Sequence, residues 1–425
     1  MKTILKNGTL VSDKLQKKDI SIAKNKIAKI ADNIEADKED TVIDLNGSFI
    51  FPGFIDMHVH LREPGQEEKE TLFTGLSAAV KGGITAVCSM PNTEPVIDNE
   101  FLIKFLKDKA WEINKARLYP IGSITKGLEG KELSEMGLML KSGAVAFSDD
   151  GKPLNDYLLL RRALQYMDRY DIPLVLHCEE MKLTTEGAIN EGYHSTILGL
   201  PGIHSCSEEA CIASSIEVAK YFGKIHIAHV STKSSVDIIR FAKQRGINVT
   251  AETAPHYFTL TENFLTNYNT NAKMNPPLRT EEDRLAIIQG LKDGTIDTIA
   301  TDHAPHTFDD KNQEFNLAAF GISGLETAVM LTLDKLVHQE NFELTKISEL
   351  WSSNPAKILN IKNTKLQIGN IADFTIIDLD KKWQIKKSKL ITRGKNTPFI
   401  GWKGTGQAIM TIIAGKIVWQ EQQKK

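Results

Sequence analysis

Between residues 52 and 363 the chain repeats one pattern, in which a short apolar run ends in a polar cluster and is followed by a stretch with helical periodicity. Such alternation predicts parallel strands joined by right-handed crossovers, and eight strands close a (β/α)8 barrel. An open doubly wound sheet is the alternative, but it would gather its site at one switch point, whereas here polar residues end nearly every run. The runs cover residues 53–61, 84–92, 117–125, 143–151, 172–180, 224–232, 247–256 and 296–306.

Both ends of the chain carry short runs of alternating apolar and polar residues, which are typical of strands. They lie at 3–11, 19–31 and 41–51 at the front and at 372–380 and 408–420 at the back. Two or three short strands are marginally stable alone, so we expect the two ends to meet. The predicted organisation is a small discontinuous β-sandwich domain (1–51 and 364–425) around a barrel domain (52–363).

Composition excludes several classes of partner. The chain has 52 basic and 54 acidic residues, a net charge of −2 and no long basic run, so neither nucleic acid nor an anionic membrane is an expected partner. No apolar run approaches the ~18 residues of a spanning helix, and the N-terminus does not read as a signal peptide. Four cysteines without a C-x-x-C pair fit a reducing compartment. We expect a cytoplasmic protein.

The predicted strand ends supply the ligands of a metal site. The carboxyl ends of barrel strands converge on one mouth, so polar residues there become neighbours. Imidazoles with carboxylates are metal ligands by type, and more than three of them indicate two ions. The candidates are His58, His60, Asp149, Asp150, His177, His229 and Asp302.

Strand parity refines this set. His58 and His60 are two residues apart and should share the inner face of the barrel. By the same count from His229, His226 has the opposite parity and is expected to face the helices. Two divalent ions ~3.5–4 Å apart need an anionic bridge, which either Asp149 or Asp150 could provide because parity does not choose where a strand is ending.

Such a centre implies hydrolysis of an unreactive acyl bond. Two divalent cations lower the pKa of a shared water towards ~7, so that hydroxide can attack a polarised carbonyl at neutral pH. Asp302 is the candidate for carrying the proton to the leaving group, with a plain ligand role as its alternative.

Further residues at the mouth suit an anionic substrate. Arg62 lies two residues beyond His60, where a guanidinium group can bind a carboxylate. Asn92 and Asn275 follow the second and seventh strands and could bind carboxylate or amide groups, with turn formation as their alternative. His306 could reach the same ligand. The polar segment 306–319 is expected to be either a mobile lid or a solvated loop.

Eight motifs in this order resemble those of the class I bacterial dihydroorotases, within the amidohydrolase superfamily, over nearly the whole chain. They are DMHVHLREPG, SMPNT, FSDDG, HCEE, HVST, MNPPLR, ATDHAPH and NTPFIGW. The resemblance implies a distorted barrel with two zinc ions that cyclises N-carbamoyl-L-aspartate reversibly to L-dihydroorotate, the third step of de novo pyrimidine synthesis. It also implies a homodimer and possible association with aspartate carbamoyltransferase.

The resemblance also assigns roles to residues by motif. His58, His60 and Asp302 would hold one metal and His177 and His229 the other, with Asp150 rather than Asp149 as the bridge and Asp302 as the proton shuttle. His256 would lie next to the metal ligands without binding a metal itself. The substrate would be held by Arg62, Asn92, Asn275, His306 and the backbone near Phe320 and Gly321.

Two positions depart from the pattern, and two other functions compete. Many relatives have Pro at Ala319 and Val at Lys152. Hydantoinases and allantoinases share the barrel, but they usually bridge their metals with a carboxylated lysine on strand four, and residues 143–151 contain no lysine. A non-catalytic partner of aspartate carbamoyltransferase is the other alternative, but such a chain would be expected to have lost ligands that are present here.

Overall fold

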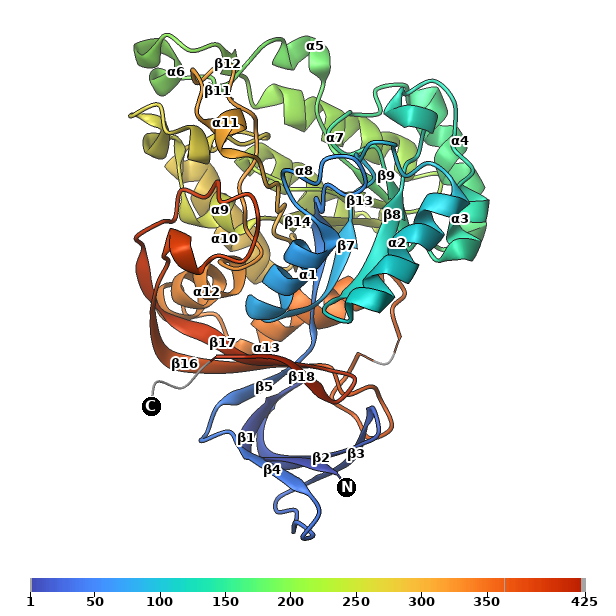
Figure 1. Cartoon of the computed structure of the whole chain (residues 1–425). Coiled ribbons are helices and arrows are strands. Elements are labelled where there is room, and N and C mark those ends of the chain that lie inside the picture. The colour runs from blue at the N-terminus through green and yellow to red at the C-terminus, as the bar shows by residue number, and fades with distance from the viewer. Residues whose placement is uncertain (1, 363, 422–425) are drawn as a thin grey trace.

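The central sheet of the computed structural model is an eight-stranded parallel barrel (Figure 1). The structure describes residues 2–362 and 364–421. The strands pair in chain order, and a parallel bridge between Val59 and His303 joins the two edges, so the barrel is nearly closed and the predicted barrel is confirmed. The strands are β6 (Phe54–Val59), β7 (Ile84–Ser89), β8 (Arg117–Gly122), β9 (Ala146–Ser148), β10 (Leu174–Leu176), β13 (Ile225–Ile227), β14 (Val249–Thr253) and β15 (Thr298–Ile299).

Amphipathic helices cover the outside of the barrel. In the second of them, Ile103, Leu106 and Ala110 lie on one buried face, while Phe101 and Trp111 are exposed. Threonine N-caps start several helices by accepting backbone N–H bonds, as Thr232 does from Ser235. The long outer helices are α1 (Leu72–Lys81), α2 (Glu100–Ile113), α3 (Met136–Ser142), α4 (Tyr157–Met167), α7 (Cys206–Ala219), α8 (Lys233–Gln244) and α10 (Glu281–Asp293).

Short elements fill the longer connections and the segment after β15. In the connection from β10 to β13, β11 (Ile189–Asn190) pairs with β12 (Gly202–Ile203). The short α-helices are α5 (Met181–Thr184), α6 (Tyr193–Leu198), α9 (Pro255–Thr259), α11 (Phe308–Lys311), α12 (Ala328–Thr332), α13 (Leu344–Ser348) and α14 (Asn354–Ile358). No helix of the two described ranges has both the length and the apolar character needed to cross a membrane.

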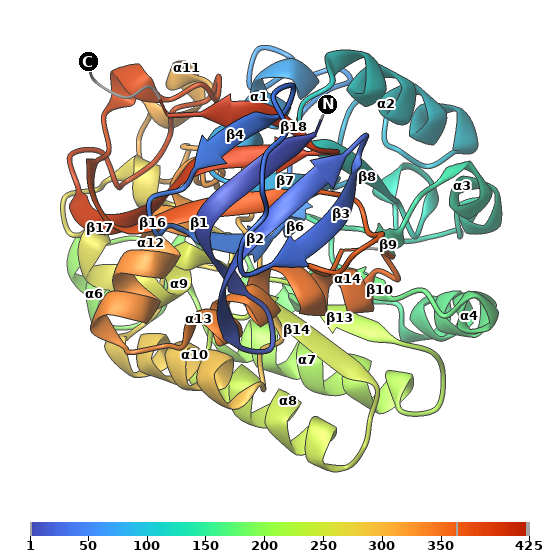
Figure 2. The same cartoon turned by 90° about the horizontal axis from the view of Figure 1, so that it is seen from below.

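The two chain ends build a second eight-stranded sheet below the barrel (Figures 1 and 2). Strand β5 runs antiparallel to β16 and so joins the front strands to the back strands. Apolar side chains from both ends, including Leu5, Ile20, Phe374 and Ile412, form one buried core. The strands are β1 (Thr3–Val11), β2 (Leu15–Ala23), β3 (Lys26–Ala31), β4 (Thr41–Asp44), β5 (Phe49–Pro52), β16 (Phe374–Gln384), β17 (Lys403–Ile413) and β18 (Lys416–Gln420).

This pairing supports the domain division expected from the sequence, which we propose as 1–51 with 364–425 against 52–363. Residue 363, at the second boundary, and residues 1 and 422–425 lie outside the described residues.

Candidate metal centre and active site

Six buried side chains meet at the carboxyl ends of the barrel strands. They are His58, His60, Asp150, His177, His229 and Asp302. Asp150 lies at their centre: its Oδ1 is 3.5 Å from His58 Nε2, 3.6 Å from His177 Nδ1 and 3.5 Å from His229 Nε2. Its Oδ2 is 3.4 Å from His60 Nε2. Two ligands of one tetrahedral zinc ion lie about 3.4 Å apart, because each is about 2.1 Å from the metal. The spacing therefore suits cation binding.

The ligand atoms divide into two groups that share Asp150. One group is His58, His60 and Asp150, and the other is Asp150, His177 and His229. Asp302 adds to the first group, since its Oδ1 lies 3.3 Å from His60 Nε2 and 3.5 Å from His58 Nε2. The structure thus brings together the six residues that the motifs single out.

Two atoms at the centre lack hydrogen bonds. His58 Nε2 and Asp150 Oδ1 are fully buried and have no hydrogen-bond partner in the part of the chain that the structure describes. Buried polar atoms without a partner are rare in proteins. Burial would raise the pKa of Asp150, but His58, His177 and His229 lower it well below its usual range, so the group stays a carboxylate. His177 Nδ1 lies within hydrogen-bond distance of His229 Nε2, at 2.8 Å. The unpartnered His58 Nε2 and Asp150 Oδ1 are the atoms that fit a divalent cation, because an imidazole nitrogen and a carboxylate oxygen are both common metal ligands.

Three of the histidines are oriented by a second side chain. His58 donates from Nδ1 to Glu252 at 2.8 Å, and His177 donates from Nε2 to Glu179 at 2.9 Å. His60 donates from Nδ1 to Asn92 Oδ1 at 2.8 Å. Each bond leaves the other ring nitrogen to face the centre, which is the usual arrangement around a metal-binding histidine.

Asp149 points away from the histidines. Its Oδ1 accepts hydrogen bonds from the N–H groups of Ile124 (2.8 Å) and Thr125 (3.0 Å), and its Oδ2 accepts from the Thr125 hydroxyl. Asp149 therefore holds the chain after β8, and Asp150 alone of the pair faces both histidine groups.

The predicted substrate residues Arg62 and His306 lie side by side. Arg62 is buried, donates from Nε to the Pro305 carbonyl at 3.2 Å, and has Nη2 3.4 Å from His306 Nε2. Burial lowers the pKa of Arg62 to about 10, so the group is still a cation at neutral pH. His306 Nε2 lies 2.8 Å from the Phe320 carbonyl, which accepts its proton. Burial, with Arg62 and Lys311 nearby, lowers the pKa of His306 to about 3, so its ring is neutral.

Both candidate asparagines contact the residues around the centre. Asn92 accepts from His60, as described, and Asn275 donates from Nδ2 to Glu179 Oε2 at 3.1 Å. The predicted outer residue His256 is buried in α9, and burial lowers its pKa to about 4.

The parity prediction for His226 is wrong. His226 Nε2 lies 3.1 Å from Glu252 Oε2, while the other oxygen of Glu252 contacts His58 inside the barrel. His226 therefore lies beneath the centre and not among the helices. The count failed because β13 ends at Ile227 and His229 has a φ of 37°, so alternation does not continue from the strand to His229.

Sequence reasoning missed Glu179 and Glu252 as functional candidates. Glu252 carried a recognisable signal, because a carboxylate in the middle of a buried strand requires a partner. Glu179 lies two residues after His177 in the HCEE motif.

The segment 306–319 contains the short helix α11, and Thr270 holds it from outside by donating its hydroxyl proton to the Lys311 carbonyl at 2.6 Å. Ala319 donates its N–H to the Asp310 carbonyl at 3.0 Å, a bond that a proline at this position could not make. Lys152, the other departure, is exposed at the turn after Asp150.

Comparison with known proteins places the chain in a family. Residues 49–418 match the model of the amidohydrolase family. A dihydroorotase of Endomicrobium trichonymphae is 51% identical over 383 residues, which is 90% of this chain and 91% of the relative. A dihydroorotase of Syntrophus aciditrophicus (strain SB) is 46% identical and covers 99% of this chain and 100% of its own. Among solved structures, the L-hydantoinase (dihydropyrimidinase) of Arthrobacter aurescens is 26% identical, with a TM-score of 0.88 over 99% of this chain and 96% of its own.

Proposed function

This chain belongs to the amidohydrolase family, and we propose that within it the protein is a dihydroorotase, which interconverts N-carbamoyl-L-aspartate and L-dihydroorotate in pyrimidine biosynthesis. The observation that carries this proposal is the buried Arg62 cation beside the histidine–aspartate cluster. The substrate has a carboxylate next to the ring amide, and a guanidinium group binds a carboxylate through two parallel hydrogen bonds.

We propose that the cluster holds two zinc ions. His58, His60 and Asp302 would bind one and His177 and His229 the other, with Asp150 shared between them. When bound, such ions supply a nucleophilic water at neutral pH and polarise the amide carbonyl. Asp302 would carry the proton to and from the ring nitrogen on its carboxylate. Arg62, Asn92, Asn275, His306 and the backbone of Phe320 and Gly321 orient the substrate.

A hydantoinase is the second candidate, because the fold is that of the L-hydantoinase described above. Two features favour the dihydroorotase. Residues 143–151 contain no lysine that could be carboxylated, and Asp150 occupies the shared position. Hydantoin also lacks the carboxylate that Arg62 would bind. A chain that only supports aspartate carbamoyltransferase is disfavoured because the full ligand set is present.

The test compares substrates on purified, zinc-loaded protein. We expect turnover of L-dihydroorotate and of N-carbamoyl-L-aspartate to exceed turnover of hydantoin and allantoin by orders of magnitude, with two zinc ions per chain by elemental analysis. A preference for hydantoin or allantoin would replace the proposal. If activity appeared only when aspartate carbamoyltransferase was added, the chain would instead be a partner of that enzyme.

We also propose a cytoplasmic homodimer that can associate with aspartate carbamoyltransferase. Sedimentation of the protein alone tests the homodimer, and sedimentation of a mixture with the transferase tests the association. Fractionation of the source cells tests the location.

A further inference from the structure

Two lysines next to the proposed substrate site are buried without a carboxylate partner in the described part of the chain. Lys273 is 2% exposed and Lys311 is 5% exposed. A buried cation without a counter-ion is costly unless hydrogen bonds replace its hydration. Burial lowers the pKa of Lys311 to about 7 and that of Lys273 to about 8, in keeping with this environment.

Main-chain carbonyls replace the counter-ions. Lys311 Nζ donates to the carbonyls of Ala319 (2.6 Å), Gly321 (3.1 Å) and Lys273 (3.4 Å), so all three of its protons are used. Lys273 Nζ donates to the carbonyls of Phe315 (2.7 Å) and Asn316 (3.0 Å). Four of these five acceptors belong to residues 315–321. This segment follows α11 and ends with Phe320 and Gly321, the proposed substrate contacts.

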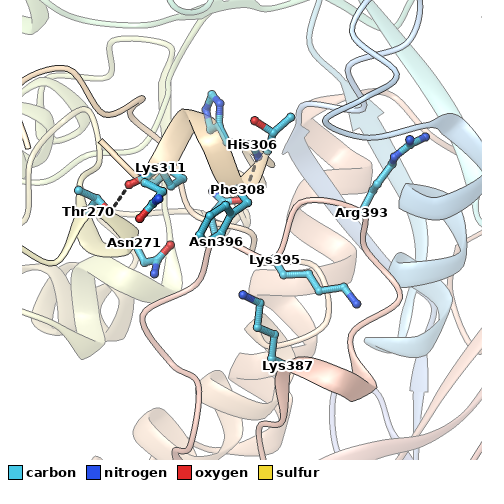
Figure 3. Close-up of a pocket in the computed structure, with 11 residues that line it drawn as sticks. Thr270, Asn271, His306, Phe308, Lys311, Lys387, Arg393, Lys395 and Asn396 are labelled. Carbon is cyan, nitrogen blue, oxygen red and sulfur yellow. Dashed lines mark hydrogen bonds between the residues drawn. The ribbon is translucent and has the colours of Figure 1, made fainter. Parts of the chain in front are cut away.

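Asn396 holds the same segment from the other side. Its Nδ2 donates to the Gly321 carbonyl at 3.0 Å. Its Oδ1 accepts from the His306 N–H at 2.8 Å, and Figure 3 shows these two residues side by side. The Gly321 carbonyl thus receives two donors. Gly321 has a φ of 143°, and a Cβ there would lie 2.7 Å from the Ala304 carbonyl, so only glycine fits between these contacts.

The result is a fixed position for Phe320. Its carbonyl accepts the proton of His306 Nε2, which lies 3.4 Å from Arg62 Nη2. Its N–H donates to no partner within residues 2–362 and 364–421, which leaves that group available to a bound molecule. A chain of direct contacts therefore runs from Lys311 through Ala319 and Gly321 to His306 and Arg62.

We propose that Lys311 is a positioning residue for substrate binding, which holds the Ala319 and Gly321 carbonyls so that Phe320 and His306 meet the substrate in one geometry. This inference rests on the proposed function, in which that segment contacts the substrate. Lys311 itself touches neither the metal ligands nor Arg62 through any hydrogen bond of the described residues, so its loss should affect binding more than chemistry.

The test is the variant Lys311→Met, which keeps the length of the side chain and removes its donors. We expect KM for L-dihydroorotate to rise at least about tenfold, with kcat changed less than about threefold and zinc content unchanged. Lys387→Met is the matched control, because Lys387 is exposed on the same pocket (Figure 3) and its replacement should leave both constants unchanged. An unchanged KM, or a loss of kcat and zinc instead, overturns the proposal.

Two further measurements keep the test decisive. Amide hydrogen exchange of residues 315–322 should accelerate in Lys311→Met and not in Lys387→Met, a readout that holds even if the wild-type protein does not turn over dihydroorotate. If Lys311→Met does not fold, Asn396→Asp removes the opposite donor to Gly321 while retaining the acceptor for His306. That variant should raise KM in the same way, and wild-type KM and exchange in it would overturn the proposal.

Discussion

Glu252 holds His58 in the orientation that the metal centre needs: its Oε1 accepts the Nδ1 proton of His58 at 2.8 Å, and both residues are fully buried. The second oxygen of Glu252 contacts His226 Nε2 at 3.1 Å, so the carboxylate is fixed from two sides. Because Nδ1 is engaged, His58 presents Nε2 to Asp150 and Asp302.

Replacing this carboxylate tests its role. Glu252→Gln keeps the shape and one acceptor but removes the charge that makes His58 a stronger ligand, so we expect zinc affinity to fall about 10- to 100-fold. Competition with a chelator measures the change. Glu326→Gln is the control, since Glu326 is also buried but contacts Ile391, Thr392 and Lys81. Equal zinc affinities in the two variants would contradict the prediction.

The neighbouring aspartates should respond differently to the same change. Asp150→Asn should remove most of the bound zinc, because Asp150 is shared by both ligand groups. Asp149→Asn should retain zinc but lower the free energy of unfolding by about 1–3 kcal/mol, because it weakens bonds to Ile124 and Thr125. Elemental analysis and urea unfolding on both proteins check this pair. Zinc loss in Asp149→Asn alone would reverse our assignment of the shared ligand.

Replacing Asp302 should lower kcat without removing the zinc, unlike replacement of a residue that only binds metal. Asp302→Asn retains an oxygen near His58 and His60 but cannot accept a proton, so kcat should fall by about 10²–10⁴-fold with most zinc still bound. Asp309→Asn, an exposed change on α11, serves as the control. If Asp302→Asn turned over at a near-normal rate, Asp302 would be a ligand only.

Much of this architecture could be predicted because its causes are local. The eight apolar runs with polar ends predict the barrel. Barrel geometry brings His58, His177 and Asp302 together around Asp150 although they are far apart in the chain. The two-residue spacing of His58 and His60 also predicts that both face the inside of the barrel, because side chains two residues apart on a strand point to the same face.

The failures lie where the backbone leaves the regular strand. His229, Asp302 and Arg62 have φ values of 37°, 45° and 62°, so alternation does not extend to them, and the prediction for His226 inherited that error. Parity left the choice between Asp149 and Asp150 open, because β9 ends at Ser148, before either residue. The contacts of Lys311 and Asn396 were outside sequence reasoning altogether, because their acceptors are main-chain carbonyls, which every residue has.

Arg62 should determine affinity for the substrate carboxylate. Arg62→Met keeps an apolar stem, and we expect KM for N-carbamoyl-L-aspartate to rise about 10- to 100-fold, since hydrogen bonds between charged groups contribute about 1.5–3 kcal/mol. The neutral analogue dihydrouracil provides the internal comparison, because any turnover of it should be affected far less. A KM unchanged from wild type would remove Arg62 from the carboxylate site.

The neutral ring of His306 predicts how stability depends on pH. Its pKa is about 3 in the folded protein, against an ordinary value of 6.5, because it is buried and lies near Arg62 and Lys311. Between these values the unfolded chain binds a proton that the folded chain does not, so the free energy of unfolding falls as the pH drops below 6.5 and is unaffected above it. The contribution should reach about 1–2 kcal/mol by pH 5.

His306→Gln should remove this part of the acid sensitivity while its amide still donates to the Phe320 carbonyl. Urea unfolding between pH 5 and 8, in a chelator so that zinc release does not contribute, compares the variant with wild type. His338→Gln, at an exposed histidine, should keep the wild-type slope. If His306→Gln and wild type lost stability in parallel below pH 6.5, His306 would take up its proton in the folded state, and the neutral ring beside Arg62 would have to be abandoned.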